Sequence, residues 1–146
     1  MDRIPARAAT ARAAALLFAV SLVSACSSVS LADTGPLKLT GDQEVPPVTT
    51  AATGQSTIRI ASDGAVSGEV KTTDVEGTMA HIHTGARGAN GPVIVPLVKA
   101  ADGVWAVPAG ARLTADQLAT YKAGGLYVNV HSEAHKGGEI RAQLQP

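Results

Sequence analysis

Short runs of alternating apolar and polar residues, separated by turn-forming segments, cover most of the chain after residue 36. Side chains alternate between the two faces of a β-strand, so each run predicts a strand with one apolar and one polar face. Residues 56–60 and 66–70 alternate in this way on either side of Ser62-Asp63-Gly64, and they predict a β-hairpin. Residues 92–98 are almost continuously apolar, which predicts a buried strand.

The last two predicted strands, 126–131 and 139–144, indicate how they pair. If they form a hairpin in which the numbers of paired residues sum to 270, one register places every apolar residue on one face. The other face then holds three polar pairs, which are Tyr127 with Gln143, Asn129 with Arg141, and His131 with Glu139. A slip of one residue would mix the faces, so we predict this register, with its polar face in water.

A single helix is predicted near 114–123. Thr114 as N-cap and Gln117 at the third helical position form a capping box, and Gly124-Gly125 ends the helix. About eight short strands, many turns and this helix predict an all-β fold, an antiparallel Greek-key β-sandwich.

The first 35 residues differ from the rest. Arginines within residues 1–12 precede a short apolar run at 13–23, which is the pattern of a secretory signal and is too short to span a bilayer. Val23-Ser24-Ala25-Cys26 resembles the lipobox of bacterial lipoproteins, which implies cleavage before Cys26 and lipid attachment to it. An ordinary signal peptide, leading to secretion, is the alternative.

These features divide the chain into three parts. We expect a cleaved signal peptide over 1–25, the lipidated Cys26 with a tether over 26–35, and one domain over 36–146. The domain would lie on the periplasmic side of the cell envelope. The outer membrane is favoured because Ser27, and not Asp, follows the cysteine.

Composition narrows the set of partners. The chain has 12 basic and 12 acidic residues, so it has no electrostatic attraction for nucleic acid. One Trp, two Tyr and one Phe offer no platform on which bases could stack. We therefore expect no nucleic-acid partner. The expected partners are the membrane, through Cys26, and a protein of the cell envelope.

All four histidines lie between residues 81 and 135. His81 and His83 share one strand face about 6.6 Å apart, at ~3.3 Å per residue, so both imidazoles could reach one metal ion. His131, on the polar face of another strand, is the expected third ligand. His135 at the hairpin tip and Met79 are weaker candidates. Imidazole suits copper or zinc and a thioether favours Cu(I), so we expect copper before zinc.

Nearby acidic and basic residues have simpler interpretations. Glu139, the predicted neighbour of His131, could accept its second ring N–H and fix the tautomer. Glu44, Glu139 and Arg141 do not form an acid–base site, because no nucleophile with an adjacent base accompanies them. Arg141 opposite Asn129 is more simply a polar pair on a solvated face. The alternative for the histidines is a structural role, in which they hydrogen-bond to loops without an ion.

Several motifs together resemble the CHRD (chordin-type) domain. In chain order they are Leu39-Thr40-Gly41, Gln43-Glu44-Val45-Pro46-Pro47, Ala80-His81-Ile82-His83, Gly91-Pro92-Val93, Leu126-Tyr127-Val128-Asn129-Val130-His131 and Gly138-Glu139-Ile140-Arg141-Ala142-Gln143-Leu144. The resemblance covers about residues 36–146, in a single copy and without the cysteine-rich modules of animal chordins. It implies a domain and brings no particular chemistry with it.

The His81-x-His83 strand and the glycine-rich segment after it also resemble the corresponding element of copper–zinc superoxide dismutases. The chain lacks a clear Asp-bearing zinc loop and the structural disulfide, so dismutase activity is not carried over. Three hypotheses stay open: a lipoprotein that binds copper or zinc for buffering or delivery, a non-enzymatic module that recognises a protein or glycan, and a copper redox enzyme. The first is preferred, and no catalytic residue is predicted.

Overall fold

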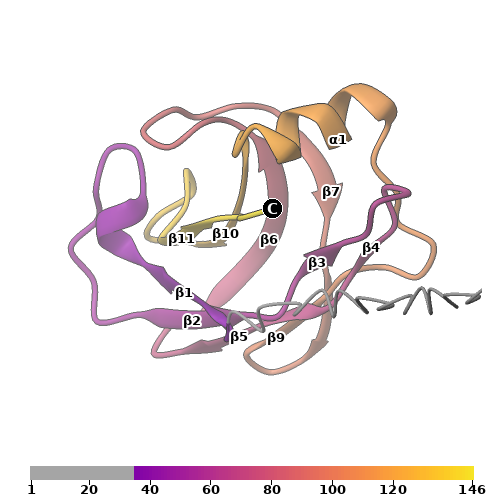
Figure 1. The fold of residues 1–146 in the computed structure, drawn as a ribbon. Coiled ribbons are helices and arrows are strands. Elements are labelled where there is room, and N and C mark those ends of the chain that lie inside the picture. Colours follow the sequence, from indigo (N-terminus) through magenta and orange to yellow (C-terminus); the bar gives the residue numbers. More distant parts are fainter. Residues whose placement is uncertain (1–34) are drawn as a thin grey trace, which may run out of the picture. The chain divides into compact units, whose positions relative to one another are not determined.

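The computed structural model describes residues 35–146, which form a β-rich body with one short α-helix (Figure 1). The strands are β1 (Leu37–Thr40), β2 (Thr53–Ser56), β3 (Arg59–Ile60), β4 (Val66–Ser67), β5 (Glu69–Thr73), β6 (Gly77–Thr84), β7 (Val93–Pro96), β8 (Val98–Ala101), β9 (Val104–Ala106), β10 (Leu126–Ser132) and β11 (Ile140–Gln143). A 3-10 turn, η1 (Gly41–Gln43), follows β1, and the helix is α1 (Ala115–Lys122). The prediction of an all-β antiparallel fold with one short helix is confirmed.

Nine of these strands form one antiparallel sheet that curls until its edges meet. Its order is β7-β6-β10-β11-β1-β2-β5-β9-β8, while β3 and β4 pair separately. β7 and β8 stand at opposite ends of this order, yet only Leu97 separates them along the chain. One bent segment therefore supplies both edges, and the sheet is nearly closed, as the ribbon shows (Figure 1).

The interior of the curled sheet is the hydrophobic core. Each strand contributes alternate side chains to it, as expected for a closed sheet. The residues with 0% exposure are Leu39, Val70, Ile82, Leu126, Val128, Val130 and Ile140. The β10–β11 pairing follows the predicted register, with Tyr127 opposite Gln143 and Asn129 opposite Arg141. Because the apolar residues of both strands lie inside, this hairpin belongs to the centre of the fold.

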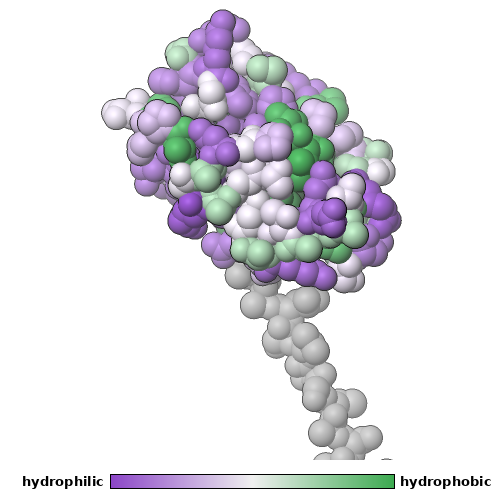
Figure 2. All heavy atoms as spheres, turned by 90° about the horizontal axis from the view of Figure 1, so that it is seen from above, coloured by the Kyte–Doolittle hydropathy of each residue, from purple (hydrophilic) through white to green (hydrophobic). Residues whose placement is uncertain are grey.

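Two strand predictions need correction. Residues 92–98 are not a buried strand, since Val93 is 46% exposed and Val98 is 55% exposed. The segment forms the edges of the sheet, so only the inward-facing Val95 and Leu97 are covered. Figure 2 shows one face of the molecule, on which apolar groups are interrupted by polar ones. In the predicted hairpin of 56–60 and 66–70, only β3 and β4 pair with each other, and the flanking residues join the main sheet.

The helix begins as the sequence predicts. The Thr114 side chain accepts from the Gln117 backbone N–H, and the Gln117 side chain accepts from the Thr114 N–H, which is the complete capping box. Tyr121 of the last helical turn donates its hydroxyl proton to the Gln145 carbonyl at 2.6 Å, joining α1 to the chain end.

Within residues 35–146, no helix is both long and apolar enough to cross a bilayer. The predicted signal peptide, Cys26 and most of the tether lie outside the described residues.

Candidate metal centre

Two histidines project from the outward face of β6, on the opposite side from the core. Ala80 and Ile82 of this strand are buried in the core, so His81 and His83 must face the other way. The β6–β10 register places His83 opposite Tyr127 and His81 opposite Asn129. His131 of β10 lies on the same face, two residues beyond Asn129 and opposite Met79. Strand geometry alone therefore brings three imidazoles together.

The three rings meet at one point. One nitrogen from each of His81, His83 and His131 lies within 4.8 Å of the other two. His81 Nδ1 and His131 Nε2 are 3.0 Å apart. Two nitrogens that bind one tetrahedral ion at ~2.0–2.1 Å are about 3.3 Å apart, so this pair needs almost no movement to share an ion.

Backbone carbonyls set the tautomers of two of these rings. His83 Nδ1 donates to the Gly91 carbonyl at 2.9 Å, and His131 Nδ1 donates to the Lys136 carbonyl at 3.0 Å. A carbonyl oxygen only accepts, so the proton of each ring lies on Nδ1 and the lone pair lies on Nε2. Metal-binding histidines characteristically have this arrangement.

The lone pair of His83 has no partner of its own. Its Nε2 is buried and accepts no hydrogen bond from the described residues. Burying an acceptor without a partner is costly, and a metal ion bound to the lone pair would remove that cost. The residues present therefore fit a transition metal, on the geometry of the cluster and on this unpartnered nitrogen.

Burial also keeps the imidazoles neutral. Desolvation, aided by the neighbouring His131 and His83, lowers the pKa of His81 to about 4. The pKa values of His83 and His131 are lowered as well, again chiefly by burial. Neutral imidazole is the form that binds metals, so each ring has one unprotonated nitrogen at neutral pH. The His131 Nε2 lone pair accepts a hydrogen bond from His81 Nδ1, which an ion bound between them would replace.

The polar face of β10 and β11 is buried, whereas the sequence predicted that it would lie in water. Asn129 and Arg141 are each 1% exposed. Arg141 donates to the Ala86 and Ala89 carbonyls and to Asn90 Oδ1. Loop 85–91 therefore lies over this face. Arg141, interpreted from the sequence as a solvated polar partner, instead holds the loop that carries Gly91.

The His83 ring packs against Tyr127, which in turn packs against Arg141. The guanidinium of Arg141 lies 3.5 Å from the ring centre of Tyr127. The Tyr127 ring lies parallel to His83, with 4.7 Å between the centroids and 6° between the planes. Three flat groups in a stack leave His83 little rotational freedom, which favours a preformed site.

A buried carboxyl group completes this polar cluster. Glu44 is 4% exposed, and burial raises its pKa to about 7 against the opposing influence of Arg141 and Asn129. A Cβ at position 138 would overlap Glu44 Oε1 and Asn129 Nδ2, so only glycine fits there. The sequence pattern did not mark Glu44 as a functional residue. The signal that could have found it is its place in the Gln43–Pro47 motif.

The weaker candidates from the sequence have different surroundings. Glu139 accepts hydroxyl protons from Thr50 and Ser132, while the Lys136 carbonyl occupies the position at His131 that was predicted for Glu139. His135 lies in the β10–β11 turn and is not part of the three-histidine cluster. Met79 is 48% exposed, on the same face as the cluster.

A family model described as the CHRD domain matches residues 36–144 of the chain. Neither the comparison with curated proteins nor the comparison with solved structures finds a match.

Proposed function

The chain belongs to the CHRD domain family. Because three imidazoles converge on its fold, we propose that this protein binds a transition metal ion, copper before zinc, through His81, His83 and His131. Its role would be to buffer or deliver the ion in the cell envelope. The single observation that carries the proposal is the three-histidine cluster, in which one nitrogen of each ring lies within 4.8 Å of the other two and the buried His83 Nε2 has no hydrogen-bond partner among the described residues.

The donor set supports copper over zinc. Three imidazoles suit either metal, and for a given nitrogen site Cu²⁺ binds more tightly than Zn²⁺. Met79 lies opposite His131 on the same strand face, and its thioether would favour Cu(I). His135 and Met79 would contribute less to the affinity for the ion than the three histidines. Glu139 would not bind the ion itself.

The charge around the site supports a monovalent ion. The nearby guanidinium of Arg141 opposes positive charge on His83, in addition to the larger effect of burial. Glu44, with a pKa of about 7, is half protonated near neutral pH and offsets only part of that charge. Adding one positive charge here costs less than adding two, so Cu(I) is the best match.

Localisation is part of the same proposal. A lipidated Cys26 would anchor the domain to the outer membrane on its periplasmic side, with secretion as the alternative. The tether would leave the domain free to meet a protein partner in the envelope.

The test compares metal uptake by four matched variants. The purified protein should bind about one equivalent of Cu(I), measured by competition with a chromophoric chelator under reducing conditions. His81→Ala, His83→Ala and His131→Ala should each weaken binding by roughly 100-fold or more, since even the loss of a group that only hydrogen-bonds to a metal ligand costs 10–100-fold. His135→Ala is the control, because it removes a histidine outside the cluster and should leave the affinity unchanged.

Two outcomes would contradict the proposal. The first is an equal loss of affinity in His135→Ala and in the cluster variants, which would place the ion elsewhere. The second is an unchanged melting temperature of the unmutated protein on adding copper, because an ion that binds only the folded state must raise it.

A further inference from the structure

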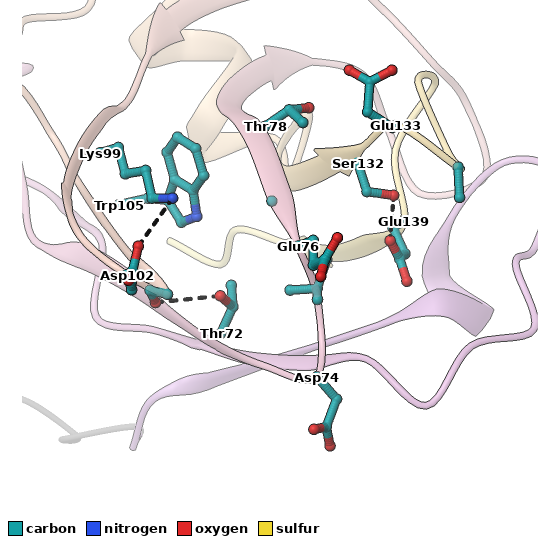
Figure 3. A pocket seen from close by; sticks show the side chains of 14 residues that line it. Thr72, Asp74, Glu76, Thr78, Lys99, Asp102, Trp105, Ser132, Glu133 and Glu139 are labelled. Atoms are coloured by element: carbon teal, nitrogen blue, oxygen red, sulfur yellow. Dashed lines mark hydrogen bonds and ion pairs between the residues drawn. The ribbon is translucent and has the colours of Figure 1, made fainter.

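A separate pocket lies where three connections between strands meet, and none of the three metal-site histidines lines it. The connections are β5–β6, β8–β9 and β10–β11, and the pocket has a volume of about 670 Å³ (Figure 3). Small-molecule sites usually have roughly 300–1,000 Å³. The pocket is therefore large enough for a ligand such as a sugar.

The pocket is acidic. Its charged residues are one lysine and five acids, which are Lys99 and Asp74, Glu76, Asp102, Glu133 and Glu139. Three of these acids have partners: Asp102 pairs with Lys99, Glu133 pairs with Lys136, and Glu139 accepts from Ser132 and Thr50. Asp74 and Glu76 have no ion-pair partner within residues 35–146. Figure 3 shows Asp74 pointing away from the other side chains of the pocket, so Glu76 is the acid whose charge is available to a ligand.

A hydrogen-bond donor on an otherwise buried side chain opens into the pocket. Trp105 is only 4% exposed, and its indole N–H has no acceptor among the described residues. A side chain at the pocket-lining Gly77 would lie 3.3 Å from Nε1, so glycine keeps this edge of the indole open. The indole N–H of a tryptophan buried to this extent normally has a hydrogen-bond partner. This donor is an observation independent of the acidic residues.

The two features together define the ligand. Figure 3 shows Glu76 between the Trp105 wall and the Ser132–Glu139 hydrogen bond. A ligand that matches both must present a positive charge with N–H donors to Glu76 and an acceptor oxygen to the indole N–H. A simple alkylamine lacks the acceptor, and a sugar acid would be repelled by the carboxylates.

We propose that this pocket binds a hydroxylated primary amine, such as an amino sugar. Its protonated amino group lies at Glu76, and one of its hydroxyl oxygens accepts from Trp105 Nε1. The proposal does not depend on metal binding, since no metal-site histidine takes part.

The single tryptophan of the chain allows a direct test by NMR. Glucosamine titrated into the ¹⁵N-labelled protein should shift the one indole N–H signal in a saturable way, and added NaCl should weaken the effect. Glucose lacks the amine, N-acetylglucosamine lacks its charge, and cyclohexylamine lacks the hydroxyl groups. Each should bind about tenfold more weakly than glucosamine or worse.

Two substitutions locate the site. Glu76→Gln keeps the shape of an exposed side chain and should weaken glucosamine binding about tenfold. Asp116→Asn, an equal change of charge on exposed α1, is the matched control and should bind like the unmutated protein. An unmoved indole signal, equal binding of glucose and glucosamine, or an equal loss in both variants would overturn the proposal.

Discussion

Glu44 is a residue whose neighbours determine its charge. Water stabilises the ionised form of an exposed carboxyl group, whereas Glu44 is nearly sealed off and depends on Arg141 and Asn129. Burial prevails, and the pKa rises to about 7. This carboxyl group, which interacts with Arg141 and Asn129, therefore changes its protonation near neutral pH.

This pKa predicts how stability depends on pH. The folded state binds the Glu44 proton more tightly than the unfolded chain, whose pKa is near 4.5. The contribution of the protonated Glu44 to the free energy of unfolding is fully present below pH 4.5, and it is lost as pH rises through about 7. In Glu44→Gln this loss is absent. The free energy of unfolding of the variant, relative to the unmutated protein, should therefore rise by about 3 kcal/mol between pH 4 and pH 8.

Urea denaturation at several pH values measures this difference. The comparison with the variant is needed because the buried histidines act in the opposite direction: their lowered pKa values make the protein less stable as pH falls below about 6.5. Parallel pH profiles of the two proteins would show that Glu44 titrates normally.

Loop 85–91 shows how an element can position His83, a proposed metal ligand, without supplying a ligand of its own. Its Gly91 carbonyl accepts from His83, and its Ala86 and Ala89 carbonyls accept from Arg141. A Cβ at position 91 would overlap the Thr84 carbonyl oxygen, so this close approach requires glycine.

Gly91→Ala should therefore weaken Cu(I) binding through the loop. Moving the Gly91 carbonyl frees the His83 ring and its tautomer, which should cost roughly 10–100-fold in affinity. Gly137→Ala is the control, because a Cβ there meets nothing within 4 Å. Both variants are measured by the chelator competition. Unchanged affinity in Gly91→Ala would show that the loop does not orient His83.

The elements that the sequence predicts best are those set by local patterns. The β10–β11 register follows from alternating residues in two neighbouring strands, and the capping box at Thr114 and Gln117 follows from residues three apart. His81 and His83 share a face for the same local reason. These features depend on strand and helix geometry alone.

What the sequence did not predict depends on distant contacts. Arg141 is buried because a loop more than 50 residues earlier in the chain lies over it. Residues 92–98 form both edges of the sheet only because the sheet curls through all nine strands. Periodicity contains no information about which loop covers a face, so it predicts a solvated face wherever a strand has a polar one.

At the scale of the whole molecule, the closed sheet leaves few places for another chain to add a strand. Exposed edges invite pairing between chains, and here the two edges belong to one bent segment. We infer that the domain contacts partners through loops and side chains. The pocket described above lies among such loops, and the histidine cluster presents side chains of β6 and β10 beside loop 85–91.

The proposed membrane attachment belongs to the scale of the whole chain, and it would depend on Cys26. Cys26→Ser should move the protein from the membrane fraction to the soluble fraction of the envelope, because a serine cannot carry the thioether-linked lipid. Immunoblotting of the separated fractions measures this. Ser28→Ala is the control for an unrelated change beside the site. Continued membrane association of Cys26→Ser would contradict the lipid anchor.

The hydrogen bonds that the Gly91 and Lys136 carbonyls accept have one more consequence. They orient two rings through hydrogen bonds within the chain, so binding and release of the proposed ion would require no refolding and little reorganisation of the surrounding chain. An ion held this way can leave by stepwise ligand exchange with a second protein, one imidazole at a time. The emptied domain would keep its shape and be ready for the next ion.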